Sequence, residues 1–212
     1  MMKRLFAWLM AAAFFSPLAA VAQETPNALI QRLSTDVLDR IKADKEIQAG
    51  NPRRVNELVD NVVMPHVNFQ RMTALAVGRH WRAATPEQQK QLMNEFRTLL
   101  LRTYSGALSQ VGNQQVRLKP LRANDGDNEV IVRSEVVQPR GEPVQLDYRM
   151  ERASDGWKIY DVNVAGVWLV ETYRNQFGQE IQAKGIDGLL KDLSEKNRSF
   201  EQGDGAASPR RS

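Results

Sequence analysis

The chain has 212 residues, no cysteine, 29 lysines and arginines, and 25 aspartates and glutamates, for a formal net charge of +4. Without cysteine it can have no thiolate nucleophile, no cysteine-ligated metal and no disulfide. Its two histidines lack partners at metal-ligand spacing, which argues against a metal site.

The first 22 residues have the pattern of a secretory signal peptide. Lys3 and Arg4 precede an apolar run that ends in small residues suited to cleavage. The run is interrupted by Pro17 and is shorter than the roughly 20 residues that span a membrane. We therefore expect residues 1–22 to be removed and the rest to be exported. No cysteine follows the signal, which excludes a lipid-anchored lipoprotein.

The first half of the mature chain has helical periodicity. Apolar residues at steps of three and four predict helices over 27–47, with Asn27 as the cap, over 55–63, over 69–78, and over a long segment from Thr85 to 111. Thr85-Pro86-Glu87-Gln88 has the form of a capping box at the start of the long helix.

After Gly112 the apolar period changes to two, which predicts four strands at 116–118, 130–136, 144–150 and 157–165. In the last strand the alternation breaks. Either a bulge near Asp161 switches faces or both faces are partly covered. Helices follow from Gly166 to Gly185 and over 186–193, and the polar tail 194–212 is expected to be disordered.

This order of elements predicts one α+β domain over 23–193. The expected fold is a curved four-stranded antiparallel sheet, cone-like and NTF2-like, which N-terminal and C-terminal helices cover and which encloses an apolar cavity. In such a fold the cavity is the natural binding site.

Charge and motifs exclude two classes of ligand. Residues 23–194 carry 23 bases and 22 acids, so the positive excess belongs mostly to the ends of the chain and nucleic-acid binding is not expected. No glycine-rich loop follows a strand, which argues against a nucleotide site.

A catalytic alternative centres on Asp161. In an apolar pocket this carboxylate could act as a base, with Tyr104 or Tyr148 stabilising an enolate oxygen. The favoured alternative is a structural Asp161 that pairs with Arg174 or accepts hydrogen bonds from turn amides. We therefore predict no catalytic residues.

The order of several short motifs resembles the MlaC family, also called toluene-tolerance auxiliary proteins, over residues 27–193. These motifs are Gly78, Trp81-Arg82, Thr85-Pro86-Glu87-Gln88, Phe96, Thr103-Tyr104, Gly156-Trp157-Lys158-Ile159-Tyr160-Asp161-Val162, Gly166-Val167, Tyr173-Arg174, Gln176-Phe177, Gly185, Leu189-Leu190 and Leu193. Trp168 departs from the family pattern, where a small polar residue is common, and the charged tail is peculiar to this chain.

The resemblance implies a monomeric periplasmic phospholipid carrier with no cofactor beyond its cargo, a glycerophospholipid. Its implied partners are an outer-membrane lipoprotein complex and the lipid-binding subunit of an inner-membrane ABC transporter, and its implied role is to maintain outer-membrane lipid asymmetry. A carrier of lipoprotein acyl groups is the alternative within this class.

Periodicity together with the resemblance gives a set of expected lipid-binding residues. The helical wall comprises Phe69, Met72, Leu75, Ala76, Phe96, Leu99, Leu100, Tyr104 and Leu108; the sheet wall comprises Val116, Leu118, Val132, Leu146, Tyr148 and Val164; Val167, Val170 and Tyr173 close one end. Arg97 and Arg174 are candidate phosphate contacts, although a structural or solvated role is favoured for both.

Overall fold

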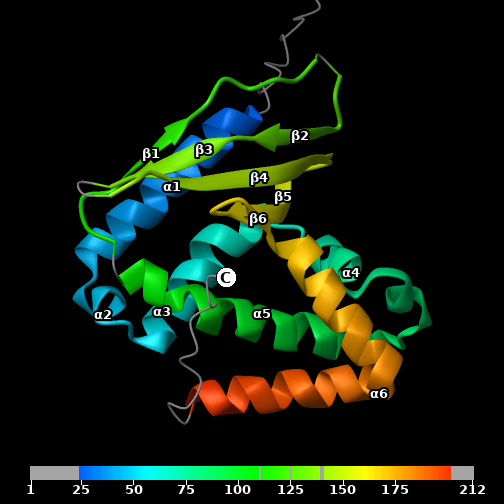
Figure 1. The fold of residues 1–212 in the computed structure, drawn as a ribbon. Coiled ribbons are helices and arrows are strands. Elements are labelled where there is room, and N and C mark those ends of the chain that lie inside the picture. Colours follow the sequence, from blue (N-terminus) through cyan, green and yellow to red (C-terminus); the bar gives the residue numbers. More distant parts are fainter. Residues whose placement is uncertain (1–23, 110, 125, 139–140, 202–212) are drawn as a thin grey trace, which may run out of the picture.

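The computed structural model describes residues 24–109, 111–124, 126–138 and 141–201. An antiparallel sheet forms one layer, and helices α4, α5 and α6 form a second layer beneath it, with α1 lying along the sheet (Figure 1). The predicted signal peptide and residues 202–212 lie outside the described residues. The expected α+β class is confirmed.

The helices are α1 (Pro26–Ala43), α2 (Lys45–Gln48), α3 (Pro52–Leu58), α4 (Phe69–Val77), α5 (Pro86–Ser109) and α6 (Leu169–Glu201). A π-helical turn over Val59–Val63 and a 3₁₀ turn over Met64–His66 continue α3, and a second 3₁₀ turn over Gly78–Ala83 leads into α5.

The caps follow from local sequence. Thr85 and Gln88 form the predicted capping box: the Gln88 amide donates to Thr85 Oγ1 at 3.2 Å, and the Thr85 amide donates to Gln88 Oε1 at 3.0 Å. The predicted cap at Asn27 was wrong. Thr25 caps α1 instead by accepting from the Ala28 amide, and Pro26 takes the first helical position.

The sheet has six strands rather than the expected four: β1 (Gln115–Leu118), β2 (Glu129–Val132), β3 (Ser134–Val137), β4 (Val144–Ala153), β5 (Gly156–Val164) and β6 (Val167–Trp168). One predicted strand is divided at Arg133 into β2 and β3, which both pair with β4. The two residues of β6 were expected to belong to the following helix, but that helix begins at Leu169 rather than Gly166.

A bulge in β5 resolves the broken alternation. The register between β4 and β5 shifts so that Met150 pairs with Ile159 while Arg149 pairs with Asp161, which leaves Tyr160 as the extra residue. Because of this insertion, Ile159 and Val162 occupy the same face of the sheet. Asp161 takes the opposite face.

The expected break between two helices at Gly185 is confirmed: α6 has a kink there, where the backbone φ of 73° favours glycine. The second helix is longer than expected, because it continues to Glu201. The prediction of disorder was therefore wrong for residues 194–201. Asn197 is buried in this segment and donates to the Glu95 carbonyl oxygen at 3.0 Å and to Glu95 Oε2 at 2.6 Å, which holds the last turns against α5.

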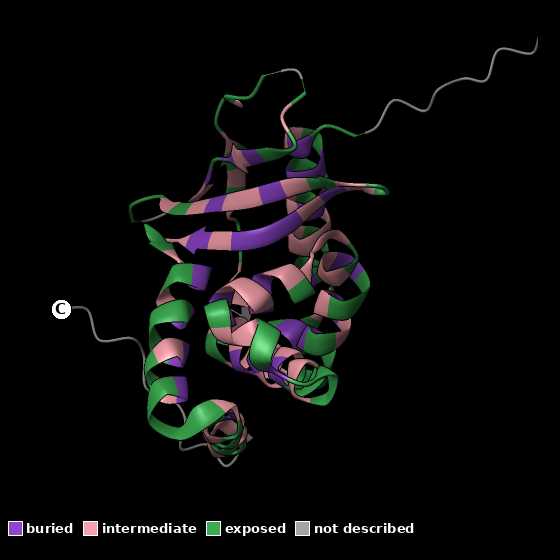
Figure 2. Ribbon diagram, turned by 90° about the vertical axis from the view of Figure 1, so that its right-hand side faces the viewer, coloured by how far each residue is buried: buried purple, intermediate pink, exposed green. Residues whose placement is uncertain are grey.

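Two hydrophobic clusters form the core. One contains residues of α4, α5 and α6, among them Phe96, whose ring forms T-shaped contacts with Tyr173 and Phe177 at centroid distances of 4.8 Å and 5.2 Å. The other joins α1, α2 and α3 to the sheet, where Val132 and Met150 are completely buried. Buried residues alternate with less buried ones along β2, whereas three consecutive residues of β5, Ile159 to Asp161, are buried (Figure 2). We call the first of these two clusters the helix cluster and the second the sheet cluster.

None of the helices in the described part of the chain is long and apolar enough to cross a membrane.

Candidate functional site: an apolar layer between sheet and helices

The candidate site is the layer where the helix cluster faces the sheet. Its sheet side is formed by the alternate residues of β4 that pair with Val162 and Val164 of β5, namely Tyr148 and Leu146. Its helical side is formed by α4 and α5. The two sides meet at Val67 and Val162, which contact both clusters.

Seven of the predicted lipid-binding residues are fully packed within the protein: Met72, Ala76, Phe96, Leu99, Val132, Val170 and Tyr173. Val132 belongs to the sheet cluster and the other six belong to the helix cluster. They therefore leave little surface for a guest molecule to cover.

Ten other predicted residues are only partly buried: Phe69, Leu75, Leu100, Tyr104, Leu108, Val116, Leu118, Leu146, Tyr148 and Val164. Phe69, Leu75, Leu100, Tyr104 and Val164 pack against the helix cluster, whereas Leu108, Leu118 and Tyr148 pack against the sheet cluster. Val116 and Leu146 belong to neither. These partly buried side chains retain apolar surface that an apolar guest would cover.

Val167, the remaining predicted residue, is 52% exposed on β6. Val67 and Val162 were missed by the sequence analysis as candidates for this layer. Val67 lies in a short connection with no apolar period, and Val162 follows the bulge, so neither could be found from spacing alone.

Tyrosines supply the polar groups of the layer. Burial raises the pKa of Tyr148 to about 12, partly offset by hydrogen bonds with Ser34 and Ser134. Burial likewise raises the pKa of Tyr173 to about 12 and that of Tyr104 above its usual value. All three hydroxyls are therefore neutral near pH 7, and the predicted lipid-binding residues carry no charge.

Asp161 is a structural group. It is 1% exposed, and its Oδ1 accepts from the amides of Val162 at 2.8 Å and Val170 at 3.0 Å. Its Oδ2 accepts from Arg149 Nη1 at 2.9 Å. Burial raises its pKa, and the amides and Arg149 counteract that effect. The expected pairing with Arg174 was wrong. Asp161 does accept backbone amides, as expected, but they belong to β5 and to the start of α6 rather than to a turn.

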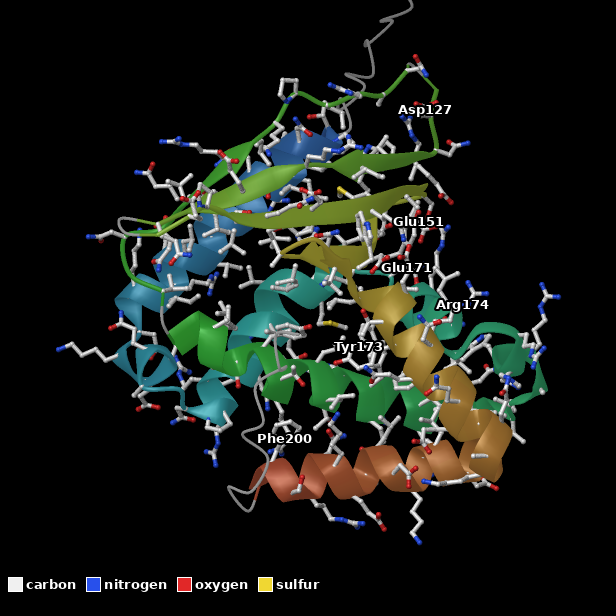
Figure 3. All side chains as sticks on the ribbon, in the orientation of Figure 1. Asp127, Glu151, Glu171, Tyr173, Arg174 and Phe200 are labelled. Carbon is white, nitrogen blue, oxygen red and sulfur yellow. The ribbon has the colours of Figure 1, made fainter. Side chains whose placement is uncertain are left out.

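The two arginines considered as phosphate contacts lie in different settings. Arg97 of α5 forms an ion pair with Asp60. Arg174 is exposed and lies on the opposite side of α6 from its buried neighbour Tyr173 (Figure 3). Neither arginine is part of the apolar layer defined above.

Two surface pockets lie outside the apolar layer. One, of about 190 Å³, is lined by residues that include Val55, Leu101 and Phe200. The other, of about 360 Å³, lies on the far face of the sheet. Among the residues that the structure describes, no group of three or more histidines, aspartates or glutamates could hold a metal ion.

Comparison with known proteins identifies the family. The family model described as MlaC protein matches residues 31–195, which is more than half of the chain. The chain belongs to the MlaC family. This membership confirms the expectation that the protein is not an enzyme.

Two curated relatives match most of the chain. The toluene tolerance protein ttg2D of Pseudomonas putida is 29% identical over 172 residues, covering 81% of this chain and 80% of that protein. The intermembrane phospholipid transport system binding protein MlaC of Haemophilus influenzae is 26% identical over 182 residues, covering 84% and 85%.

A solved structure shares the fold. The phospholipid-binding protein from Ralstonia solanacearum, in complex with a phospholipid, is 47% identical and superposes with a TM-score of 0.80. The match covers 82% of this chain and 97% of that one. The expected architecture of a sheet packed by N-terminal and C-terminal helices is thereby confirmed.

Proposed function

We propose that this protein binds a glycerophospholipid, with the acyl chains held between the sheet and the helices and the headgroup near solvent. The observation that carries the proposal is the likeness to the Ralstonia solanacearum protein, whose structure contains a phospholipid, at 47% identity and over 82% of this chain. The partly buried apolar side chains on both sides of the layer support it.

A phospholipid carrier has to offset a large free-energy cost of exposing acyl chains to water. Two acyl chains of about 15 methylenes each, at roughly 0.8 kcal/mol per buried CH₂, would cost on the order of 24 kcal/mol to expose to water. Spontaneous transfer of a phospholipid through water is therefore negligible. A protein whose apolar layer removes the acyl chains from water would allow the phospholipid to be transferred.

We further propose that the carrier works in the periplasm. It would exchange lipid between an outer-membrane lipoprotein complex and the lipid-binding subunit of an inner-membrane ABC transporter, and so maintain outer-membrane lipid asymmetry. The name of the Haemophilus influenzae relative, an intermembrane phospholipid transport system binding protein, supports this setting. Enclosure also opposes release into water, so unloading requires docking that joins two apolar surfaces.

The competing hypothesis of an enzyme with Asp161 as its base receives no support. Both carboxylate oxygens of Asp161 are occupied by Val162, Val170 and Arg149. A general base needs an oxygen within reach of the substrate proton. Asp161 therefore stabilises the start of α6.

Leu100→Arg tests the assigned layer. Leu100 is a partly buried residue of α5 that packs against the helix cluster, so an arginine there would place a charge among the acyl chains. The matched control is Ala107→Arg, which adds the same side chain at an exposed position of the same helix. We expect Leu100→Arg to lower the phospholipid content per folded protein and Ala107→Arg to leave it unchanged.

A second variant separates lost binding from lost folding. Leu146 is partly buried and belongs to neither hydrophobic cluster, so Leu146→Gln is expected to fold like the parent and still to lower the lipid content. Its control is Arg117→Gln, at an exposed position of β1 in the same sheet. Unchanged lipid content in folded Leu100→Arg and Leu146→Gln would show that the acyl chains lie elsewhere.

A further inference from the structure

A concave surface lies on the face of the sheet that points away from the apolar layer. Its volume is about 360 Å³, and it is lined by Arg122, Glu129, Val130, Ile131, Arg133, Arg149 and Tyr160. In β2 the residues Glu129 and Ile131 alternate with the buried Val130 and Val132, and Ile131 is directly opposite Arg149 of β4. The pocket is thus built on the outward positions of the sheet.

Arg149, which forms one side of this pocket, is held by two ion pairs and an aromatic ring. Arg149 donates to Asp161 Oδ2 at 2.9 Å and to Glu171 Oε1 at 3.1 Å, and its guanidinium lies 4.0 Å from the centre of the Trp168 ring. Glu171 is at the start of α6, directly below the sheet (Figure 3). Arg149 is therefore fixed in place and its charge is already balanced.

The acidic residue of the pocket is likewise engaged. Glu129 forms an ion pair with Arg71 at 2.6 Å and accepts the Tyr160 hydroxyl at 2.9 Å. Arg71 also pairs with Glu151 and stacks on the Tyr160 ring at 3.8 Å. These contacts lower the pKa of Glu129, chiefly through Arg71. Glu129 is therefore not available to neutralise the remaining arginines.

Two arginines supply the charge that the pocket presents. Arg122 and Arg133 are exposed, and neither forms an ion pair or side-chain hydrogen bond with any residue that the structure describes. They lie on neighbouring segments, because the Lys119 amide donates to the Arg133 carbonyl oxygen at 2.8 Å and Arg122 follows shortly after Lys119. Two unpaired guanidinium groups thus share one concave surface.

We propose that this pocket is a second binding site, separate from the apolar layer, and that it takes a phosphate monoester group. A guanidinium presents donors in a fork that matches two oxygens of an anion. A carboxylate has only two oxygens and can pair with the donors of one guanidinium group. The three terminal oxygens of a phosphate monoester can accept from both guanidinium groups, and its second negative charge balances the second arginine. The group comes either from a soluble phosphate ester or from a membrane lipid with a terminal phosphate.

The test is a titration of the purified protein with inorganic phosphate at constant ionic strength, followed by NMR. We expect saturable shifts of the amide signals of Ile131 and Tyr160, and about tenfold weaker binding in Arg122→Gln and in Arg133→Gln. Arg117→Gln is the matched control, because Arg117 is exposed on β1 of the same sheet but does not line the pocket. All three positions are exposed, so the variants are expected to fold normally.

Sedimentation with vesicles identifies the source of the phosphate. Retention by vesicles that contain phosphatidic acid, but not by phosphatidylcholine vesicles, assigns the site to a membrane lipid, and binding of inorganic phosphate alone assigns it to a soluble ester. Both results support the proposal provided that Arg133→Gln weakens the binding about tenfold, as expected for phosphate. The proposal is overturned if phosphate shifts no signal in the pocket, if acetate binds equally well, if an acidic peptide binds where phosphate does not, or if Arg117→Gln weakens binding as much as Arg133→Gln.

Discussion

At the scale of single residues, Asp161 connects the sheet to the last helix. Its carboxylate accepts two backbone amides, one of them at the start of α6, and pairs with Arg149 of the neighbouring strand. A carboxylate at a helix N-terminus satisfies an orphan amide and complements the helix dipole. These bonds account for the burial of Asp161, the residue that was considered as a catalytic base, through a structural role.

Asp161→Ala is expected to lower the free energy of unfolding by about 3 kcal/mol, because it leaves buried amides without an acceptor and removes one partner of a largely buried pair. Asp161→Asn retains one accepting oxygen and should cost less. Urea unfolding measures both, with Asp36→Ala, at an exposed ion pair, as the control that should have little effect. A stability of Asp161→Ala equal to that of the parent would contradict this role.

His66 is expected to make the free energy of unfolding depend on pH. Burial, together with Arg32 and Lys158, lowers the pKa of His66 below its ordinary value of 6.5, and Glu24 and Asp155 oppose this. The unfolded chain therefore binds a proton more readily than the folded protein. The contribution of His66 to the free energy of unfolding is fully present above pH 6.5, and it is lost as the pH falls from 6.5 through the pKa of His66 in the folded protein.

The measurement is urea unfolding of the parent and of His66→Gln across this range. The parent should lose stability relative to His66→Gln as the pH falls below 6.5, because glutamine cannot take up the proton. Parallel stability curves for the two proteins would show that His66 does not titrate differently in the folded state.

At the scale of elements, the start of α5 is specified locally. The reciprocal bonds of Thr85 and Gln88 form as the sequence predicts, and Gln88 additionally donates to Asp187 of α6 at 2.7 Å. The cap therefore positions α5 and also connects it to the second half of α6.

Thr85→Ala is expected to lower the free energy of unfolding by about 1 kcal/mol, since it leaves the Gln88 amide without its acceptor. Thr35→Ala, at an exposed position within α1, is the control and should stay within about 0.5 kcal/mol of the parent. Equal effects of the two substitutions on the urea midpoint would contradict a capping role for Thr85.

The elements that the sequence did not predict lack a local signal. β6 has two residues, too few to show a period, and its pairing with β5 depends on tertiary contact. The last turns of α6 carry an apolar spacing of Leu189, Leu193 and Phe200, but the position between them is occupied by Asn197. A polar residue at this position predicts exposure to solvent, whereas in the folded protein Asn197 is buried and its Nδ2 donates to Glu95.

At the scale of the whole molecule, the sequence predicts the two layers but not how the core divides between them. Helical and strand periods correctly place Phe96 and Val132 on apolar faces. Spacing alone cannot distinguish a side chain packed on all sides, such as Phe96, from one that retains exposed surface, such as Leu146. That difference depends on contacts between segments far apart in the chain.

The proposed function places the acyl chains at the partly buried apolar layer between the two hydrophobic clusters. If the apolar surface between them is covered by acyl chains, the protein needs a guest to complete its interior. Protein purified under non-denaturing conditions from a Gram-negative host should then carry phospholipid.

The most direct test is mass spectrometry of an organic extract of that purified protein, with the amount of lipid compared with the amount of protein. The account predicts glycerophospholipid at a near-stoichiometric level. An extract without phospholipid at that level, or an acyl chain that remains linked to a second protein, would contradict it.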